Sequence, residues 1–126
     1  MLLTILVLAG MAGPAAAQIR IGQTAGFSGA VASSVKEATD GAKLYFDAVN
    51  ARGGVNGQKI ELISLDDQFD PKLAVENAKK LIGQGVVALF LNRGTPHTQA
   101  IMPLLAEARI PLVEIGRASC RERVCT

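Results

Sequence analysis

Apolar runs along the chain alternate with segments whose apolar residues recur every three or four positions. The runs predict strands at residues 19–25, 58–65, 86–91 and 109–115. The periodic segments predict helices within residues 33–51, 66–85 and 92–108. This alternation, with short connections, predicts an α/β fold with a parallel sheet and helices on both faces. The run "VVALFL" at 86–91 is apolar throughout, which predicts a central strand covered on both faces.

Each predicted helix has one apolar face, which is expected to pack on the sheet. In the first helix this face consists of Ala38, Ala42, Tyr45 and Val49. In the second helix it consists of Ala74, Ala78, Leu81 and Ile82. In the third helix it consists of Ile101, Leu104, Leu105 and Ala108.

Capping residues mark the starts of the first two helices. Ser33 or Ser34 precedes the first helix, and Glu37 follows Ser34 at the spacing of a capping box. In the second helix, Asp70 is expected to be the N-cap and Pro71 the first helical residue.

Parallel sheets bind ligands at the carboxyl ends of their strands. Three loops at such ends therefore compete for function: residues 25–33, 66–70 and 92–98. The first contains Gly26 and Gly29, but the full G-x-G-x-x-G pattern of a dinucleotide site is absent. The second, "DDQFD", has three carboxylates. They are suited either to holding a cation or an ammonium group or to a solvated turn.

The loop "NRGTPHT" at 92–98 is the most informative of the three. Thr95 is expected to be the N-cap of the third helix and Pro96 its first helical residue. The backbone N–H groups of His97 and Thr98 then lie at the positive end of the helix dipole, where a carboxylate or phosphate is favoured. Gly94 allows a ligand to approach the backbone closely. The alternative is that Thr95 only caps its own helix.

His97 is the only histidine, and no cysteine partner or Ser/Asp constellation accompanies it. It therefore indicates neither catalysis nor a metal site, and it is expected at the solvent edge or beside a ligand. No carboxylate pair resembles that of a hydrolase. We expect no catalytic residue, no cofactor and no metal.

Composition narrows the class of protein further. The 126 residues are 49% hydrophobic and 19% charged, which is typical of a globular domain. The net charge of +2 arises in residues 115–126, because residues 1–114 contain ten basic and ten acidic side chains. No basic stripe remains for nucleic acid.

Residues 1–17 are expected to be a signal peptide. An apolar run is followed by Ala15 and Ala17, which form an A-x-A cleavage pattern before Gln18. Since position 18 is not cysteine, we expect a soluble periplasmic protein after cleavage.

Residues 19–113 resemble the N-terminal lobe of periplasmic solute-binding proteins of the branched-chain amino acid (Leu/Ile/Val) type. The resemblance is carried by "NARGGVNG" at 50–57, by the strand that follows it, and by "DDQFDP" opening a helix. Within "NARGGVNG", Asn56 and Gly57 predict a tight turn. The resemblance implies a type I periplasmic-binding-protein lobe and no enzymatic activity. It also implies a small-molecule solute, an ABC permease as partner and a monomeric full-length protein.

The resemblance also implies which residues contact the solute. They lie after the first strand, at Phe27 and Ser28, and after the third, at Gly94, Thr95, His97 and Thr98. In the family that this chain resembles, many amino-acid binders carry a Ser-rich loop at the latter place. Because "GTPHT" replaces it here, the implied solutes include amides and small organic acids as well as amino acids.

A further solute loop should follow the fourth strand near Val113, but the chain continues as "EIGRASCRERVCT". This segment resembles translated sequencing-adapter DNA, so residues 115–126 are expected to be a non-native tail and residues 18–114 a partial lobe. Two alternatives remain open. One is a ligand-sensing receptor domain of the same fold, and the other is an exported NAD-binding enzyme of the short-chain dehydrogenase type.

Overall fold

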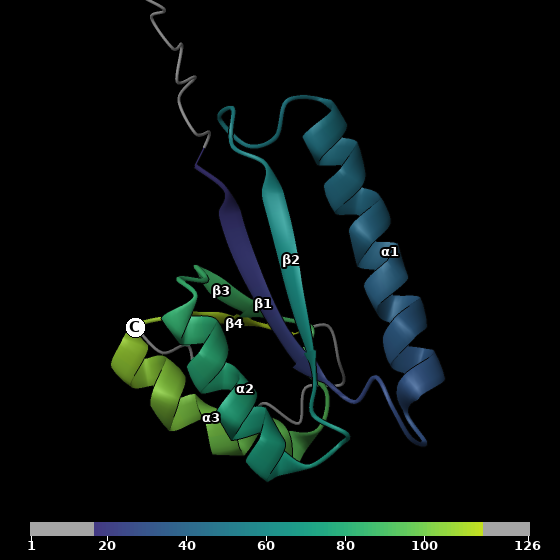
Figure 1. The fold of residues 1–126 in the computed structure, drawn as a ribbon, viewed down its shortest axis with the longest axis vertical. Helices are drawn as coiled ribbons and strands as arrows, with labels where there is room; N and C mark the ends of the chain where they lie inside the picture. The colour runs from purple at the N-terminus through teal and green to yellow at the C-terminus, as the bar shows by residue number, and fades with distance from the viewer. Residues whose placement is uncertain (1–16, 115–126) are drawn as a thin grey trace, which may run out of the picture.

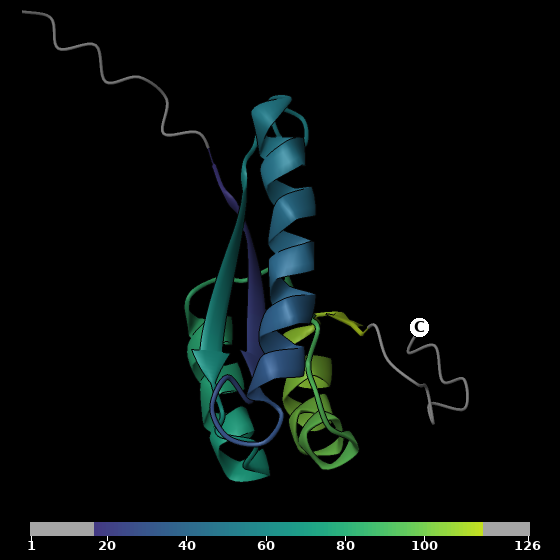
Figure 2. The ribbon, with the colours of Figure 1, turned by 90° about the vertical axis from the view of Figure 1, so that its right-hand side faces the viewer.

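The structure, a computed structural model, describes residues 17–114. Strands and helices alternate along them (Figure 1): β1 (Ile19–Ala25), α1 (Ala32–Ala51), β2 (Ile60–Asp66), α2 (Pro71–Gly83), β3 (Ala88–Phe90), α3 (Thr95–Ala108) and β4 (Leu112–Val113). The strands pair in parallel in the order β2-β1-β3-β4. α1 lies on one face of the sheet, and α2 and α3 lie on the other (Figure 2). The predicted α/β fold with helices on both faces is confirmed.

The main core lies between the sheet and the pair α2 and α3. Its buried side chains are Ala74, Ala78, Leu81, Val86, Leu89, Ile101 and Leu105. Five of them belong to the apolar faces predicted for the second and third helices. Ile82 and Leu104 pack against this cluster while remaining partly exposed. These two faces were therefore predicted correctly from hydrophobic periodicity.

The face predicted for α1 is partly wrong. Val35 and Thr39 are buried, whereas Ala38 is exposed and Tyr45 is 65% exposed. Thr39 faces the sheet because it is hydrogen-bonded there. The side-chain amide of the fully buried Gln23 donates a 3.0 Å hydrogen bond to the hydroxyl of Thr39. A pattern that counts only apolar residues does not detect such a pair.

Gln23 also joins three strands beneath α1. Its amide oxygen accepts a 2.8 Å hydrogen bond from the hydroxyl of Ser64 in β2. Its amide nitrogen donates more weakly, at 3.4 Å, to the carbonyl oxygen of Leu91 just after β3. Because a buried polar group is stable only when it is hydrogen-bonded, this side chain fixes how β1 sits between its neighbours.

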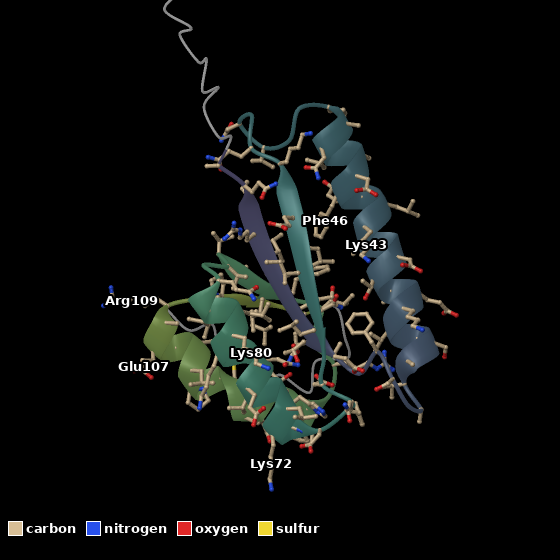
Figure 3. All side chains as sticks on the ribbon, viewed as in Figure 1. Lys43, Phe46, Lys72, Lys80, Glu107 and Arg109 are labelled. Atoms are coloured by element: carbon tan, nitrogen blue, oxygen red, sulfur yellow. The ribbon has the colours of Figure 1, made fainter. Side chains whose placement is uncertain are left out.

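β3 is shorter and more exposed than predicted. It spans three residues rather than 86–91, and Val87 before it is 55% exposed. Leu89 is fully buried on the side of α2 and α3. On the other side Phe90 is only half-buried, with its ring centroid 5.7 Å from that of Phe46, which points from α1 toward the sheet (Figure 3). The predicted central position of this strand is confirmed, since β3 lies between β1 and β4. The predicted cover on both faces is only partly right, because α1 packs mainly along β2 and reaches β3 through Phe46.

The two predicted helix caps have different outcomes. Asp70 caps α2, since its carboxylate accepts a 2.8 Å hydrogen bond from the amide of Lys72. α1 begins at Ala32, two or three residues earlier than Ser33 or Ser34 as N-cap predicts, and its N-cap is Val31. The hydroxyl of Ser34 donates to the carbonyl oxygen of Val31 at 3.0 Å, so the predicted capping box is wrong.

The predicted turn at Asn56 and Gly57 is confirmed. Both residues have positive φ, of 50° and 79°. Val55 and Gln58 flank the turn and exchange backbone hydrogen bonds of 2.8 and 2.9 Å. β2 begins at Ile60, two residues later than predicted, because 58 belongs to this turn.

Candidate functional site

The three loops singled out by the sequence meet at one edge of the sheet. They connect β1 to α1, β2 to α2, and β3 to α3, and all leave the carboxyl ends of parallel strands (Figure 1). Backbone bonding joins the first two, since the amide of Asp67 donates to the carbonyl oxygen of Ala25 at 3.1 Å. The rings of Phe69 and His97, from the second and third loops, lie 4.7 Å apart between centroids.

Asp66 holds the loop that contains Phe27 and Ser28. One of its carboxylate oxygens accepts 2.9 Å hydrogen bonds from the backbone amides of Phe27 and Gln68. Burial alone would raise the pKa of Asp66. Hydrogen bonds from the Ser28 hydroxyl and from the amides of Gln68, Phe27 and Ser28 outweigh burial and lower the pKa below its ordinary value. The carboxylate therefore orders two of the predicted solute contacts.

Asp67 is fully buried beside it in a different environment. Its carboxylate accepts hydrogen bonds from the hydroxyl of Thr24 at 3.0 Å and from the amide of Phe69 at 2.9 Å. Burial raises the pKa of Asp67; these two hydrogen bonds and the nearby His97 oppose the rise only in part. Asn77 donates to the Thr24 hydroxyl at 3.3 Å and so extends the network into α2.

Asp66→Asn and Asp67→Asn are expected to change stability in opposite directions at neutral pH. The pKa of folded Asp66 lies below its ordinary 3.8, so its ionised form stabilises the fold above that value. This stability is lost as the pH falls through the lowered pKa. The pKa of folded Asp67 lies above 3.8, so its ionised form destabilises the fold. That penalty disappears as the pH falls through the raised pKa.

Urea unfolding of the two variants at neutral and at acidic pH measures these contributions. At neutral pH we expect Asp66→Asn to be less stable than the parent and Asp67→Asn to be more stable. Both differences should shrink in acid, where the parent carboxyls are protonated. Differences of the same sign for the two variants would contradict the assigned environments.

His97 does not lie at the solvent edge, because only 2% of it is exposed. Its ring packs on Phe69 with an interplanar angle of 33°. It also fills the space beside Gly94, where a Cβ would collide with the imidazole Nδ1. The close approach that Gly94 was expected to offer a ligand is therefore used by His97. The prediction of a solvent-edge histidine is wrong, and solute contact by His97 stays a prediction.

α3 begins one residue earlier than predicted. Gly94, with a φ of 106°, is the N-cap, and Thr95 is the first helical residue rather than the cap. The amide of Thr98 donates to the carbonyl oxygen of Gly94 at 3.0 Å, so it is not unpaired as expected. Solute contact by Thr98 stays a prediction. The hydroxyl of Thr98 donates to the carboxylate of Glu114. Thr95 itself is exposed at the edge.

Sequence reasoning did not predict the burial or the role of three polar residues at this edge. Asn92 is 8% exposed, and its side-chain nitrogen and oxygen have no hydrogen-bond partner within residues 17–114. The ordering role of Asp66 and the burial of Asp67 were also missed. The run of three carboxylates was noted, but a single sequence does not indicate which carboxylate turns inward.

The carboxylates of the second loop act separately. Asp66 holds the first loop, Asp67 is buried in its own network, and Asp70 caps α2. Within the described part of the chain, no three His, Cys, Asp or Glu side chains are grouped closely enough to hold a metal ion. The loop is therefore best described as the connection that joins the other two loops.

Comparisons with known proteins agree on one family. The sequence model described as "Periplasmic binding protein" matches residues 18–125. The Leu/Ile/Val-binding protein homolog 7 of Brucella abortus is 31% identical over 115 residues, which are 90% of this chain and 29% of that protein. The matched chain thus spans less than a third of this relative.

Solved structures show the same similarity. A substrate-binding periplasmic protein from Ralstonia solanacearum superposes with a TM-score of 0.72 and 37% identity, over 75% of this chain and 28% of that one. The branched-chain amino acid transporter substrate-binding protein of Streptococcus pneumoniae, solved with isoleucine, gives a TM-score of 0.72 and 28% identity. That match covers 78% of this chain and 28% of that one.

Proposed function

The chain belongs to the periplasmic binding protein family, and we propose that it supplies the first-lobe half of a solute site in a substrate-binding protein of an ABC transporter. Members of this family bind small molecules rather than convert them, which favours a binding role over the dehydrogenase alternative. The proposed solute is an amino acid, an amide or a small organic acid. The proposed partner of the whole protein is an inner-membrane permease.

One observation carries this proposal: the loop contacts predicted for the solute gather at the carboxyl edge of the sheet. Phe27 and Ser28 are ordered by the carboxylate of Asp66. His97 packs on Phe69, which lies on the same loop as Asp66, and also contacts Gly94. This edge is where open parallel sheets bind their ligands. Thr95 and Ser28 are exposed there and are the first candidates for direct contact.

A single lobe is expected to bind its solute weakly. Micromolar affinity corresponds to about 8 kcal/mol of net binding free energy. Two or three charge-assisted hydrogen bonds, at about 1.5–3 kcal/mol each, are opposed by an association cost of about 4–15 kcal/mol. Two-lobed proteins of this kind hold the ligand by closing both lobes around it, so that contacts from the second lobe add to the binding free energy. We therefore expect millimolar or weaker binding by this chain, and calorimetry that shows micromolar affinity would contradict the proposal.

Ligand-detected saturation-transfer NMR tests the site at such affinities. Isoleucine, propionamide and propionate serve as probes of the three solute classes. We expect the best probe to lose most of its signal with Ser28→Ala, because the change removes the hydroxyl at the solute edge together with its hydrogen bond to Asp66. Ser33→Ala is the matched control, since Ser33 is exposed on α1. An equal signal from both variants, or no signal from any probe, would contradict the proposed site.

We also propose that the protein is exported and cleaved before Gln18. The non-native tail expected at residues 115–126 stays a prediction, and the family match, which extends to residue 125, does not support it. The predicted signal peptide and tail fall at residues 1–17 and 115–126, almost entirely outside the described residues. The family works outside the cytoplasm, which supports export. No described helix combines the length and the apolar character needed to cross a membrane. Mass spectrometry of the periplasmic product tests the cleavage site.

A further inference from the structure

Two buried polar side chains beside the solute edge have no hydrogen-bond partner. Both ring nitrogens of His97, and both the nitrogen and the oxygen of the Asn92 amide, are unpaired within residues 17–114. His97 is 2% exposed and Asn92 is 8% exposed. Buried groups of this kind are rare in folded proteins, because each one loses its hydration without compensation. An apolar side chain at position 97 would avoid this loss.

The backbone around His97 is strained as well. Leu91, which precedes Asn92, has a φ of 55°. Gln68 and Phe69, on the loop that faces His97, have φ of 52° and 60°. Residues other than glycine rarely adopt this left-handed region, and such outliers gather at ligand clamps and switch regions. Strain and unpaired polar groups thus occur together on two adjoining loops.

No side-chain hydrogen bond within residues 17–114 holds His97 in place. One face of its ring lies on Phe69, which is itself 46% exposed. On the other side the ring occupies the space left by the missing side chain of Gly94. Neither Phe69 nor Gly94 belongs to the buried cluster between the sheet and the pair α2 and α3.

We propose that His97 is a two-position switch. In the position described here the imidazole packs between Phe69 and Gly94 and joins the second and third loops. In the other position it leaves this niche for the carboxyl edge, where its nitrogens hydrogen-bond water or the solute. The purpose of the switch rests on the proposed function, because it would make His97 available to the solute only after the loop rearranges. The local opening itself does not depend on any solute.

Chemical modification of the only histidine measures this opening directly. Diethyl pyrocarbonate acylates an accessible neutral imidazole, and the absorbance change reports His97 alone. Urea makes global unfolding easier but has little effect on a small local opening. If His97 is exposed by local opening, its modification rate should therefore not change with urea concentration while that concentration is low. A rate that rises in parallel with the global unfolding constant from the lowest urea concentration would overturn the switch.

Gly94→Ala gives a second and independent arm. The added Cβ meets the His97 ring, so we expect the ring to be displaced. Modification should become about tenfold faster if the change raises the equilibrium constant for opening of the ring by about a factor of ten. Gly53→Ala is the matched control, because Gly53 has a φ of 103° against 106° for Gly94, and a Cβ there meets nothing within 4 Å. Equal rates in the two variants would overturn the proposal. Either result leaves the saturation-transfer test of the solute site unaffected.

Discussion

Leu81→Ala is expected to lower the free energy of unfolding by about 2–5 kcal/mol, the range for truncating a buried leucine. Leu81 is fully buried at the centre of the core that α2 shares with the sheet. Its methyl groups lie over Gly22 of β1, 3.1 and 3.2 Å from where a Cβ would stand. Because this core is the main one in the described chain, the loss should affect the whole fold cooperatively.

Urea unfolding followed by circular dichroism measures the effect. Leu44→Ala is the matched control, since Leu44 is 73% exposed on α1. We expect the control to lie within about 0.5 kcal/mol of the parent, as for most surface substitutions. Similar losses in both variants would show that the region around α2 is not the stabilising core.

Gly54→Ala is expected to have the second largest effect. Gly54 has a φ of 76°, and a Cβ there would collide with the carbonyl oxygen of Gln58, a backbone atom that has little freedom to move. Gly57→Ala isolates the conformational part, because its φ is 79° and its surroundings are open. We expect about 1–2 kcal/mol from the left-handed backbone in both variants. The collision should add about 1–3 kcal/mol in Gly54→Ala.

Thermal and urea unfolding of the two alanine variants separate these contributions. The turn between α1 and β2 positions the edge strand that carries Asp66 at its far end. Gly54→Ala should therefore also weaken the order of the loop at Phe27. If both variants lose the same stability, the close approach of Gly54 to Gln58 is not a constraint on the fold.

The order and type of the elements could be predicted from the sequence because hydrophobic periodicity carries them. Asp70 with Pro71, and Asn56 with Gly57, were placed correctly because each pair satisfies a specific backbone geometry. Thr95 was assigned as a cap on a similar pattern, but Gly94 takes the cap position because its backbone adopts a φ of 106°. Local sequence alone does not decide which of two neighbouring residues, Gly94 or Thr95, is the N-cap.

Burial of polar residues was the part that the sequence did not predict. Thr39 faces inward because Gln23 lies beneath it, and that partner is distant in sequence. His97 is buried because Phe69 and Gly94 together leave it a niche. The exposure of β3 follows from α1 lying along β2, which no local pattern encodes. Each case depends on a contact between separate elements rather than on a segment's own composition.

The central claim is that the carboxyl-edge loops of this chain form the first-lobe half of a solute site. Two-dimensional amide NMR of the isotope-labelled chain, titrated with the best of the three probes, tests it most directly. We predict shifts that are confined to residues 26–28 and 94–98 and do not saturate below millimolar concentrations. Shifts centred on the outer face of α1 or on the amino ends of the strands would contradict the claim.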